Sequence, residues 1–249
     1  MDGIIIVNKP AGWTSFDVVA KIRNLSRTRK VGHSGTLDPM ATGVLPVFLG
    51  KATKSIQSFL NGDKGYEGEM ALGIRTDTGD ADGKILNPKS EIRNNVQILI
   101  TKSQIEELFK KYTGEIEQVP PMHSAVKVNG KRLYELARKG IEVKRQPRKV
   151  TIYDLSLMQD DPQFAAAGRI AFSVLCSKGT YIRQLVVDMG DELGCGAHLS
   201  KLVRTYAHPF HISQAIDMDT IVTMAKAGIL SSVVLDPDEI LQEMNKVSA

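Results

Sequence analysis

The segment that decides the fold covers residues 31–46 and reads VGHSGTLDPMATGVLP. It contains three glycines, two prolines and one carboxylate, Asp38, and it runs into an apolar segment at residues 44–49. Glycine permits close backbone approach, and proline fixes φ and removes a hydrogen-bond donor. The composition therefore predicts a stiff loop. We expect Asp38 to be a nucleophile presented by this loop, although an Asp-Pro pair on its own is also typical of an ordinary turn.

The overall composition is that of a globular protein with a basic surface. The 249 residues are enough for one large or two small domains. No repeat, low-complexity tract or linker divides them, so we expect one catalytic domain over residues 1–249. The net charge is +4 and the pI is about 8.9. Cys176 and Cys195 have no Cys-x-x-Cys partner, which argues against structural zinc. The sequence shows no signal peptide and no apolar run of membrane-spanning length, so we expect a cytoplasmic protein.

The residues before the central loop predict a strand and then a helix. Residues 3–7 form a short apolar, β-branched run that is typical of a buried strand. Ser15 is the expected N-cap of the helix that follows. Its expected apolar stripe consists of Phe16, Val19, Ile22 and Leu25. Four cations close the segment and suit either the helix dipole or phosphate contacts: Arg23, Arg27, Arg29 and Lys30.

Later segments predict further strands and helices. Residues 66–74 and 169–176 alternate between apolar and polar side chains, which predicts two half-buried strands. A capping box at Ser103 and Glu106 predicts a helix through Tyr112. Residues 212–249 read as one or two amphipathic helices. The acidic segment 75–83 does not match a calcium-binding loop and is expected to connect two elements.

Another predicted helix, with Thr180 as its expected N-cap, places Arg183 in its first turn. A cation there opposes the helix dipole and is best tolerated against an anion. A surface acid would serve, but Asp38 is the sharper candidate, since a carboxylate in a closed site needs such a partner to stay ionised.

Residues 119–150 form the most basic part of the chain. After a stiff Pro120-Pro121 segment, two acids face nine cations, which are Lys127, Lys131, Arg132, Arg138, Lys139, Lys144, Arg145, Arg148 and Lys149. A solvated surface would mix the two signs more evenly. This balance favours contact with a nucleic-acid backbone over a merely basic surface.

Together these segments resemble the TruB family of tRNA pseudouridine synthases. The resemblance covers residues 3–210 and rests on motifs in the family's order, at 8–15, 32–46, 64–66, 75–80, 118–127 and 176–183. It implies an α+β pseudouridine synthase fold, with a mixed, largely antiparallel central sheet, flanking helices and a basic thumb-like segment at about 119–150. It also implies isomerisation of uridine 55 in the tRNA T loop to pseudouridine.

The resemblance assigns roles to individual residues. Asp38 matches the nucleophile, which acts on a flipped-out uridine at either the uracil ring or the ribose C1′, and Arg183 matches its partner. Tyr66 lines the pocket and takes a proton during the reaction. His33 enters the vacated stack, and Tyr181 and Leu202 line the uracil site. Lys9 and Pro10 belong to a motif that supports the active-site loop. Six thumb cations would contact the RNA backbone: Lys127, Lys131, Arg132, Arg138, Lys144 and Arg145.

The resemblance implies neither a metal nor an organic cofactor. The expected partner is the T-stem loop of tRNA, bound by a monomer without an obligatory protein partner. Many relatives carry a C-terminal RNA-binding PUA or PUA-like domain, and the sequence is expected to lack a complete one. Three alternatives stay open, namely a guide-RNA-dependent catalytic subunit, a non-catalytic tRNA-binding or folding module and, more remotely, a carbohydrate-active enzyme. The last has little support because no second acid accompanies Asp38.

Overall fold

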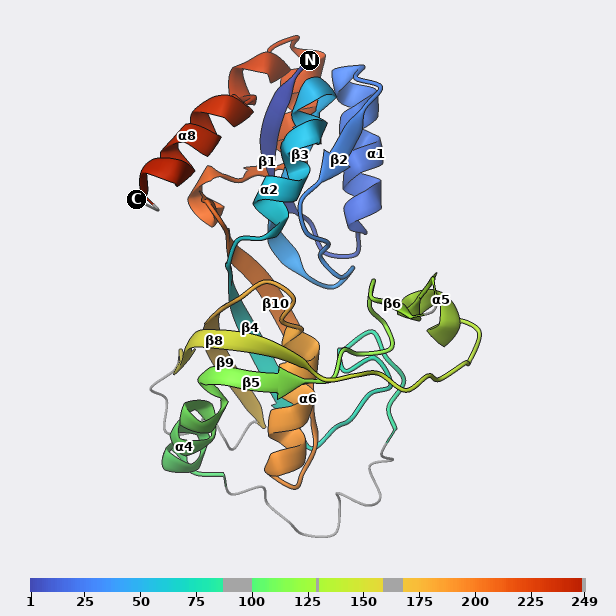
Figure 1. Ribbon diagram of the computed structural model, residues 1–249, viewed down its shortest axis with the longest axis vertical. Coiled ribbons are helices and arrows are strands. Elements are labelled where there is room, and N and C mark those ends of the chain that lie inside the picture. The colour runs from blue at the N-terminus through green and yellow to red at the C-terminus, as the bar shows by residue number, and fades with distance from the viewer. Residues whose placement is uncertain (87–99, 129, 159–167, 248–249) are drawn as a thin grey trace. The chain divides into compact units, whose positions relative to one another are not determined.

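The structure is a computed structural model that describes residues 1–86, 100–128, 130–158 and 168–247. These residues form two compact units (Figure 1). The first unit consists of Met1–Tyr66 and Leu202–Ala249, and the second of Glu67–Lys201. Two strands, β4 (Lys64–Leu72) and β10 (Ala197–Ala207), contribute residues to both units. The single catalytic domain expected from the sequence stays a prediction.

The first unit is built on β1 (Gly3–Lys9) and β3 (Thr42–Leu49), which pair antiparallel from Gly3↔Leu49 to Lys9↔Gly43. The expected strand at residues 3–7 is therefore confirmed. Around this pair lie the strands β2 (Val31–His33), β11 (Phe210–His211) and β12 (Ile216–Asp217). The helices of the unit are α1 (Ser15–Ser26), α2 (Ile56–Leu60), α7 (Met218–Lys226) and α8 (Pro237–Val247), with 3-10 turns η1 (Gly50–Ser55), η2 (Ile212–Gln214) and η3 (Leu230–Val233). The expected C-terminal helices are thus present as α7 and α8.

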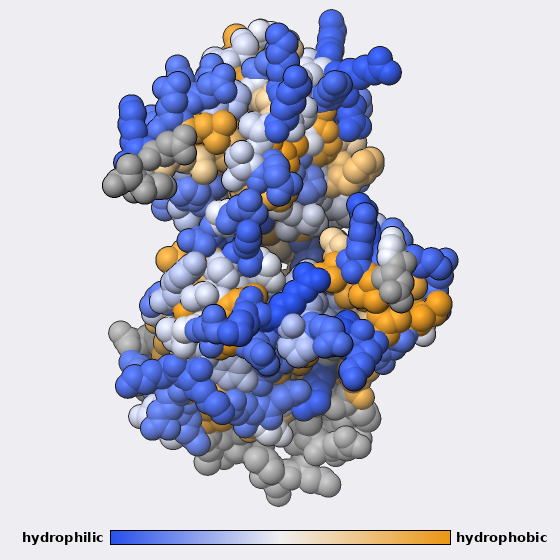
Figure 2. All heavy atoms as spheres, in the orientation of Figure 1, coloured by the Kyte–Doolittle hydropathy of each residue, from blue (hydrophilic) through white to orange (hydrophobic). Residues whose placement is uncertain are grey.

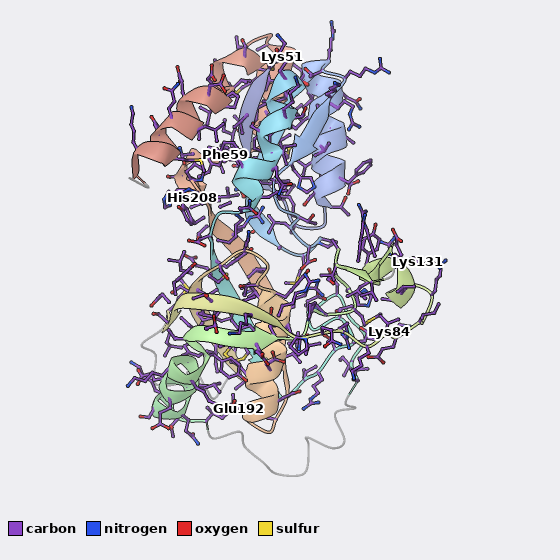
Figure 3. All side chains as sticks on the ribbon, viewed as in Figure 1. Lys51, Phe59, Lys84, Lys131, Glu192 and His208 are labelled. Carbon is purple, nitrogen blue, oxygen red and sulfur yellow. The ribbon has the colours of Figure 1, made fainter. Side chains whose placement is uncertain are left out.

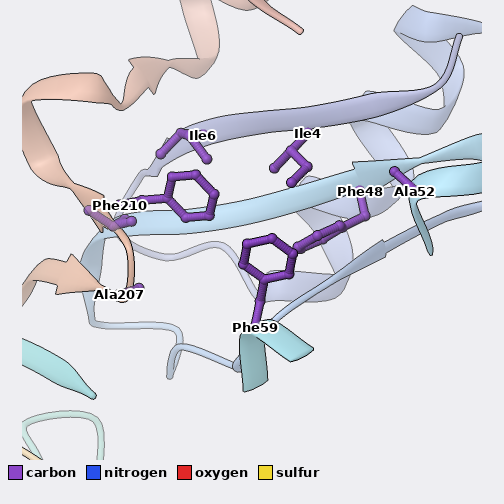
Figure 4. Packing of buried hydrophobic residues seen from close by; sticks show 8 residues of the cluster. Ile4, Ile6, Phe48, Ala52, Phe59, Ala207 and Phe210 are labelled. Carbon is purple, nitrogen blue, oxygen red and sulfur yellow. The ribbon is translucent and has the colours of Figure 1, made fainter. Parts of the chain in front are cut away.

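A cluster of aromatic and aliphatic side chains holds the first unit together (Figure 4). The Phe59 ring lies 5.2 Å from the Phe48 ring and 5.7 Å from the Phe210 ring, measured between centroids. Ile4 and Ile6 of β1 complete the cluster, and both are buried. The core therefore fixes β1, β3 and α2 against the residues that follow β10, and the loop before β3 is carried by this framework.

The start of α1 differs from the prediction in two ways. Thr14, not Ser15, is the N-cap, and it forms a capping box with Asp17. The helix therefore buries the face with Ser15, Val18, Val19 and Ile22. Phe16, which was expected in the apolar stripe, points away from this face and is 68% exposed. The reason is helical geometry, because position 16 is rotated by about 100° from the buried position 15.

The second unit is an antiparallel sheet with helices. Its strands follow the order β4–β9–β8–β5, where β5 is Gly114–Gln118, β8 is Arg148–Leu157 and β9 is Arg169–Cys176. β9 confirms the strand expected at 169–176, and β4 confirms the one expected at 66–74, shifted by two residues. The helices are α4 (Lys102–Tyr112), α5 (Leu133–Ala137) and α6 (Ile182–Glu192), and a short hairpin joins β6 (Lys127–Val128) to β7 (Lys131–Arg132). The predicted α+β class with a mixed, largely antiparallel central sheet is confirmed.

Two predicted helix caps in this unit are wrong. Thr101, not Ser103, is the N-cap of α4, and its capping-box partner is Gln104. Tyr181 occupies the N-cap position of α6, while the Thr180 hydroxyl donates to the Ser177 carbonyl at 2.9 Å instead. Both errors are shifts of one or two residues. Thr101 takes the cap of α4 with its own hydroxyl, whereas no side chain caps α6 and its start is set by the backbone dihedral angles of Tyr181.

Hydrophilic side chains cover most of the visible face of each unit (Figure 2). The main exception in this view is the α5 region, where apolar side chains gather beside basic ones. Among the described residues, no helix has both the length and the apolar character that crossing a bilayer requires.

Candidate active site

The loop that carries Asp38 lies between β2 and β3 and is held by backbone hydrogen bonds. The Ser34 N–H donates to the Pro46 carbonyl at 3.2 Å. The Ala41 N–H donates to the Asp38 carbonyl at 3.1 Å. Gly35 and Gly43 have φ values of +89° and +100°, which L side chains rarely adopt. The predicted constrained loop is present, and the Asp38 side chain is half-buried within it.

Helix α1 also fixes this loop. The Ser15 hydroxyl receives a hydrogen bond from the Leu37 N–H at 2.9 Å and lies 3.2 Å from the Leu37 carbonyl, to which it donates. The Gly12 N–H, from the turn before the helix, donates to the Pro39 carbonyl at 2.9 Å. Both residues that flank Asp38 are therefore bonded to the α1 region. Ser15 serves the loop and not the helix cap for which it was predicted.

The buried Lys9 side chain also supports this loop. Its side chain is fully buried, and its ammonium group donates to the carbonyls of Pro10, Trp13 and Pro39 at 2.9, 2.6 and 3.1 Å. Burial lowers the pKa of Lys9 from 10.5 to about 8, and the nearby Asp38 carboxylate opposes this shift. This geometry agrees with the supporting role that the sequence resemblance implied.

Replacing Lys9 by Met removes all three donors at nearly constant side-chain length. We expect Lys9→Met to be less stable by about 1–3 kcal/mol, the usual cost of leaving buried carbonyls unpaired. Because the pKa of Lys9 is lower in the folded protein, the unfolded chain binds more protons between pH 8 and 10.5. The wild-type free energy of unfolding therefore gains from this group as pH rises through that window, at most about 1.4 kcal/mol per pH unit.

Urea unfolding of both proteins across this pH range measures the difference directly. The stability gap between wild type and Lys9→Met should widen with rising pH. Lys51→Met, which changes an exposed lysine of η1 (Figure 3), is the matched control and should not alter the pH dependence. A gap that stays constant or narrows would contradict the burial argument for Lys9.

A residue that the sequence analysis did not select, Arg204, lies beside the Asp38 loop. Its side chain is 1% exposed, and Nε donates to the Val44 carbonyl at 2.7 Å while Nη2 donates to the Gly35 carbonyl at 3.0 Å. Burial lowers the pKa of Arg204, and this is opposed by a hydrogen bond with the Tyr66 side chain and by attraction from Asp38. Arg204 thus connects the predicted nucleophile with the predicted pocket tyrosine. The sequence signal was an arginine two positions after Leu202, and therefore on the same face of the strand.

The first unit also holds His33 and Leu202, two further predicted site residues. Burial and the positive charge of Arg204 lower the pKa of His33 below its usual 6.5. Within the described part of the chain, His33 Nδ1 is buried with no hydrogen-bond partner. Leu202 is 7% exposed and lies two positions before Arg204, so both side chains point to the same face of β10. Asp38, Tyr66, His33 and Leu202 are therefore all found in one unit around Arg204.

Arg183 lies in the second unit, and its guanidinium is almost fully buried. Nε lies 3.4 Å from the Asp80 carboxylate, Nη1 donates to the Thr78 carbonyl at 2.8 Å and Nη2 donates to the His123 carbonyl at 2.8 Å. An anion was expected near Arg183, and Asp80 is such an anion. It belongs to the acidic 75–83 segment, which was expected only to connect two elements. The pairing of Arg183 with Asp38, which belongs to the other unit, stays a prediction.

Tyr181 is positioned by Gln118, at the end of β5. The Gln118 side chain accepts from the Tyr181 N–H at 2.8 Å and donates to the Tyr181 carbonyl at 3.1 Å. Gln118 is 2% exposed, and these two bonds satisfy both ends of its amide. The Gln118 amide therefore bonds to the Tyr181 backbone as a neighbouring strand would, and it fixes the chain just before α6.

The basic segment at 119–150 keeps most of its cations at the surface. Five of the six predicted RNA contacts are exposed, namely Lys127, Lys131, Arg132, Arg138 and Lys144; Figure 3 labels Lys131. The guanidinium carbons of Arg132 and Arg138 lie 5.9 and 5.4 Å from the Tyr134 ring centroid. Arg145 is half-buried, donates to the Pro120 carbonyl at 3.3 Å and pairs with Glu142 at 3.1 Å. The role of all six residues in RNA binding stays a prediction.

Comparison with known proteins identifies similar families and structures. Residues 23–182 match the TruB family pseudouridylate synthase N-terminal domain, and residues 183–242 match the tRNA pseudouridylate synthase B C-terminal domain. Over 99% of the chain, 46% of residues are identical to tRNA pseudouridine synthase B of Geobacillus thermodenitrificans, of which 80% is covered. The protein of the same name from Lactococcus lactis subsp. lactis is 44% identical over the whole chain, which covers 74% of it.

Among solved structures, the chain is similar to one in the crystal structure of a Cbf5–Nop10–Gar1 complex. The TM-score is 0.72 at 30% sequence identity. The match covers 96% of this chain and 61% of the other, so the chain spans less than two thirds of that structural relative.

Proposed function

This chain belongs to the TruB family of pseudouridylate synthases, and we propose that it isomerises uridine 55 in the T loop of tRNA to pseudouridine. The observation that carries the proposal is Asp38 in a bonded loop, with Tyr66 and the buried Arg204 guanidinium beside it. A carboxylate that is held still and attracted by a cation is suited to act as a nucleophile at neutral pH. We further propose that the enzyme acts in the cytoplasm as a monomer, without a protein partner.

The proposed reaction needs no cofactor. The Asp38 carboxylate forms a covalent bond with the flipped-out uridine, and the bond between ribose C1′ and uracil N1 breaks. After the uracil has turned, C1′ joins uracil C5, the C5 proton leaves and N1 gains a proton, so that product and substrate are isomers. Release of Asp38 restores the carboxylate. Tyr66, whose hydroxyl bonds to Arg204, is the proposed group for the proton transfer.

RNA binding is assigned to His33 and the basic 119–150 segment. A uridine stacked in a folded loop must be flipped out before reaction, at a cost of a few kcal/mol. The lowered pKa of His33 keeps its ring neutral at pH 7, which suits insertion into the vacated stack. The exposed cations from Lys127 to Lys144 supply phosphate contacts. Arg183 and Tyr181 are proposed to complete the site around the uracil.

The test of the function is tritium release from C5-labelled uridine in full-length tRNA transcripts. Wild-type protein should release one tritium per tRNA, and release should stop when uridine 55 is replaced by cytidine. Replacement of other T-loop uridines should leave it intact. Release from the cytidine-55 transcript would show that the proposed position is wrong.

A smaller RNA substrate distinguishes the proposed stand-alone enzyme from a guide-RNA-dependent subunit. The relatives at 44–46% identity carry the name tRNA pseudouridine synthase B, whereas the chain from the Cbf5 complex is 30% identical. We therefore expect the protein alone to modify a T-arm hairpin without any added RNA. Activity that appears only after addition of a guide RNA would favour the alternative.

A further inference from the structure

Arg204 is a fully buried charged side chain to which the proposed reaction assigns no chemical step. Removing a guanidinium from water is costly unless its donors find acceptors. Its hydrogen bonds to backbone carbonyls both go to the region around Asp38, since Nε donates to Val44 and Nη2 donates to Gly35. These two residues lie six positions after and three positions before the predicted nucleophile. One planar group therefore ties both ends of the Asp38 loop together.

The same guanidinium reaches the pocket. It forms a side-chain hydrogen bond with Tyr66 and is attracted by the Asp38 carboxylate. Arginine presents its donors in a rigid fork, so bonds to several acceptors fix their relative positions. A lysine ammonium at the end of a flexible chain would supply the charge but not this geometry. The Arg204 guanidinium thus holds the Asp38 loop and the Tyr66 hydroxyl in fixed positions relative to each other.

The pairing of β10 with β3 places Arg204 next to the Asp38 loop. Strand β10 pairs parallel with β3, with Arg204 opposite Gly43. A Cβ atom on Gly43 would lie 2.2 Å from the Arg204 carbonyl oxygen, so only glycine permits this approach. A Cβ atom on Gly35 would lie 3.4 Å from Arg204 Nη1. Gly43 therefore permits the close approach of the Arg204 backbone, whereas the space at Gly35 would admit a Cβ atom at ordinary contact distance.

We propose that Arg204 is a positioning residue of the reaction, which holds the Asp38 loop and the Tyr66 hydroxyl in the geometry that catalysis needs. The inference rests on the proposed function, because it assigns Arg204 to the same site. It differs from a general role in stability, since the bonds of Arg204 go to the two elements that carry the reacting groups. Loss of Arg204 should therefore reduce the chemical step more than tRNA binding.

The test compares Arg204→Lys and Arg204→Ala with wild type in single- and multiple-turnover tritium release on full-length tRNA. Arg204→Ala should lower kcat about 100-fold, the effect expected from a misplacement of about 1 Å. KM should stay within about threefold, because the proposed phosphate contacts belong to the 119–150 segment. Guanidinium at millimolar concentration should raise the kcat of Arg204→Ala at least about tenfold, because it can enter the cavity that the side chain has left. Ammonium should not raise it. Arg204→Lys should recover only part of the activity.

The controls separate positioning from folding and from the proposed function. Arg169→Ala, which removes an arginine from an exposed pair with Glu69, should keep wild-type kcat. Thermal unfolding identifies variants that do not fold, and if Arg204→Ala is one of them, Arg204→Lys carries the test. A folded variant with kcat within about threefold of wild type, or a loss that guanidinium does not relieve, overturns the inference. Absence of tritium release by wild type would instead refute the proposed function.

Discussion

Asp38→Asn should lower the rate of pseudouridine formation at least about 10³-fold. The amide has nearly the same shape as the carboxylate but is not a nucleophile. Backbone groups of the loop are bonded to one another, to the Ser15 hydroxyl, to Lys9 and to Arg204, and the substitution removes none of these groups. The loop should therefore keep its conformation, and tRNA affinity should stay within about threefold of wild type.

Tritium release measures the rate, and filter retention of labelled tRNA measures the affinity. Asp219→Asn, at an exposed position of α7 in the same unit, is the matched control and should behave like wild type. Substantial activity in Asp38→Asn would remove Asp38 from the role of nucleophile. Loss of tRNA binding together with activity would favour the non-catalytic binding module instead.

Asp80→Asn should be the second most damaging change. Asp80 and Arg183 have side chains only 7% and 5% exposed, and Nε lies 3.4 Å from the Asp80 carboxylate. Removing one partner of a buried ion pair leaves the other charge uncompensated, which costs about 3 kcal/mol or more. We expect a clear loss of stability and a fall in kcat of about 100-fold, because Arg183 would lose the carboxylate that orients it together with the Thr78 and His123 carbonyls.

The exposed Asp82 provides the matched control for this experiment. Asp82→Asn makes the same chemical change at an aspartate two positions away, and this variant should keep wild-type stability and activity. Denaturant unfolding and tritium release are measured on both variants. If Asp80→Asn unfolds at the assay temperature, the rate is measured at a lower temperature at which unfolding shows it to be folded. Equal behaviour of Asp80→Asn and Asp82→Asn would show that the ion pair does not support Arg183.

The outcome at particular residues shows where sequence reasoning succeeded. The strand at residues 3–7, the alternating strand at 169–176 and the place of Arg183 in the first turn of a helix were all predicted, because each depends on local sequence patterns. The constrained Asp38 loop was predicted from its glycines and prolines. Errors occurred at helix starts, where Thr14 takes the cap expected of Ser15, and where Thr180 bonds to the Ser177 carbonyl and leaves α6 without a side-chain cap.

The amino-acid order alone was enough to place most strands and helices, the constrained loop and its carboxylate, because hydrophobic periodicity and backbone restriction act over a few residues. It could not show that Arg204 would bond to Gly35 and Val44, which lie 169 and 160 positions earlier. Nor could it show that Asp80 would face Arg183, or that Gln118 would hold the backbone of Tyr181. Such contacts depend on strand pairing and helix packing between distant segments. A buried charge next to the predicted nucleophile is visible only when those segments have come together.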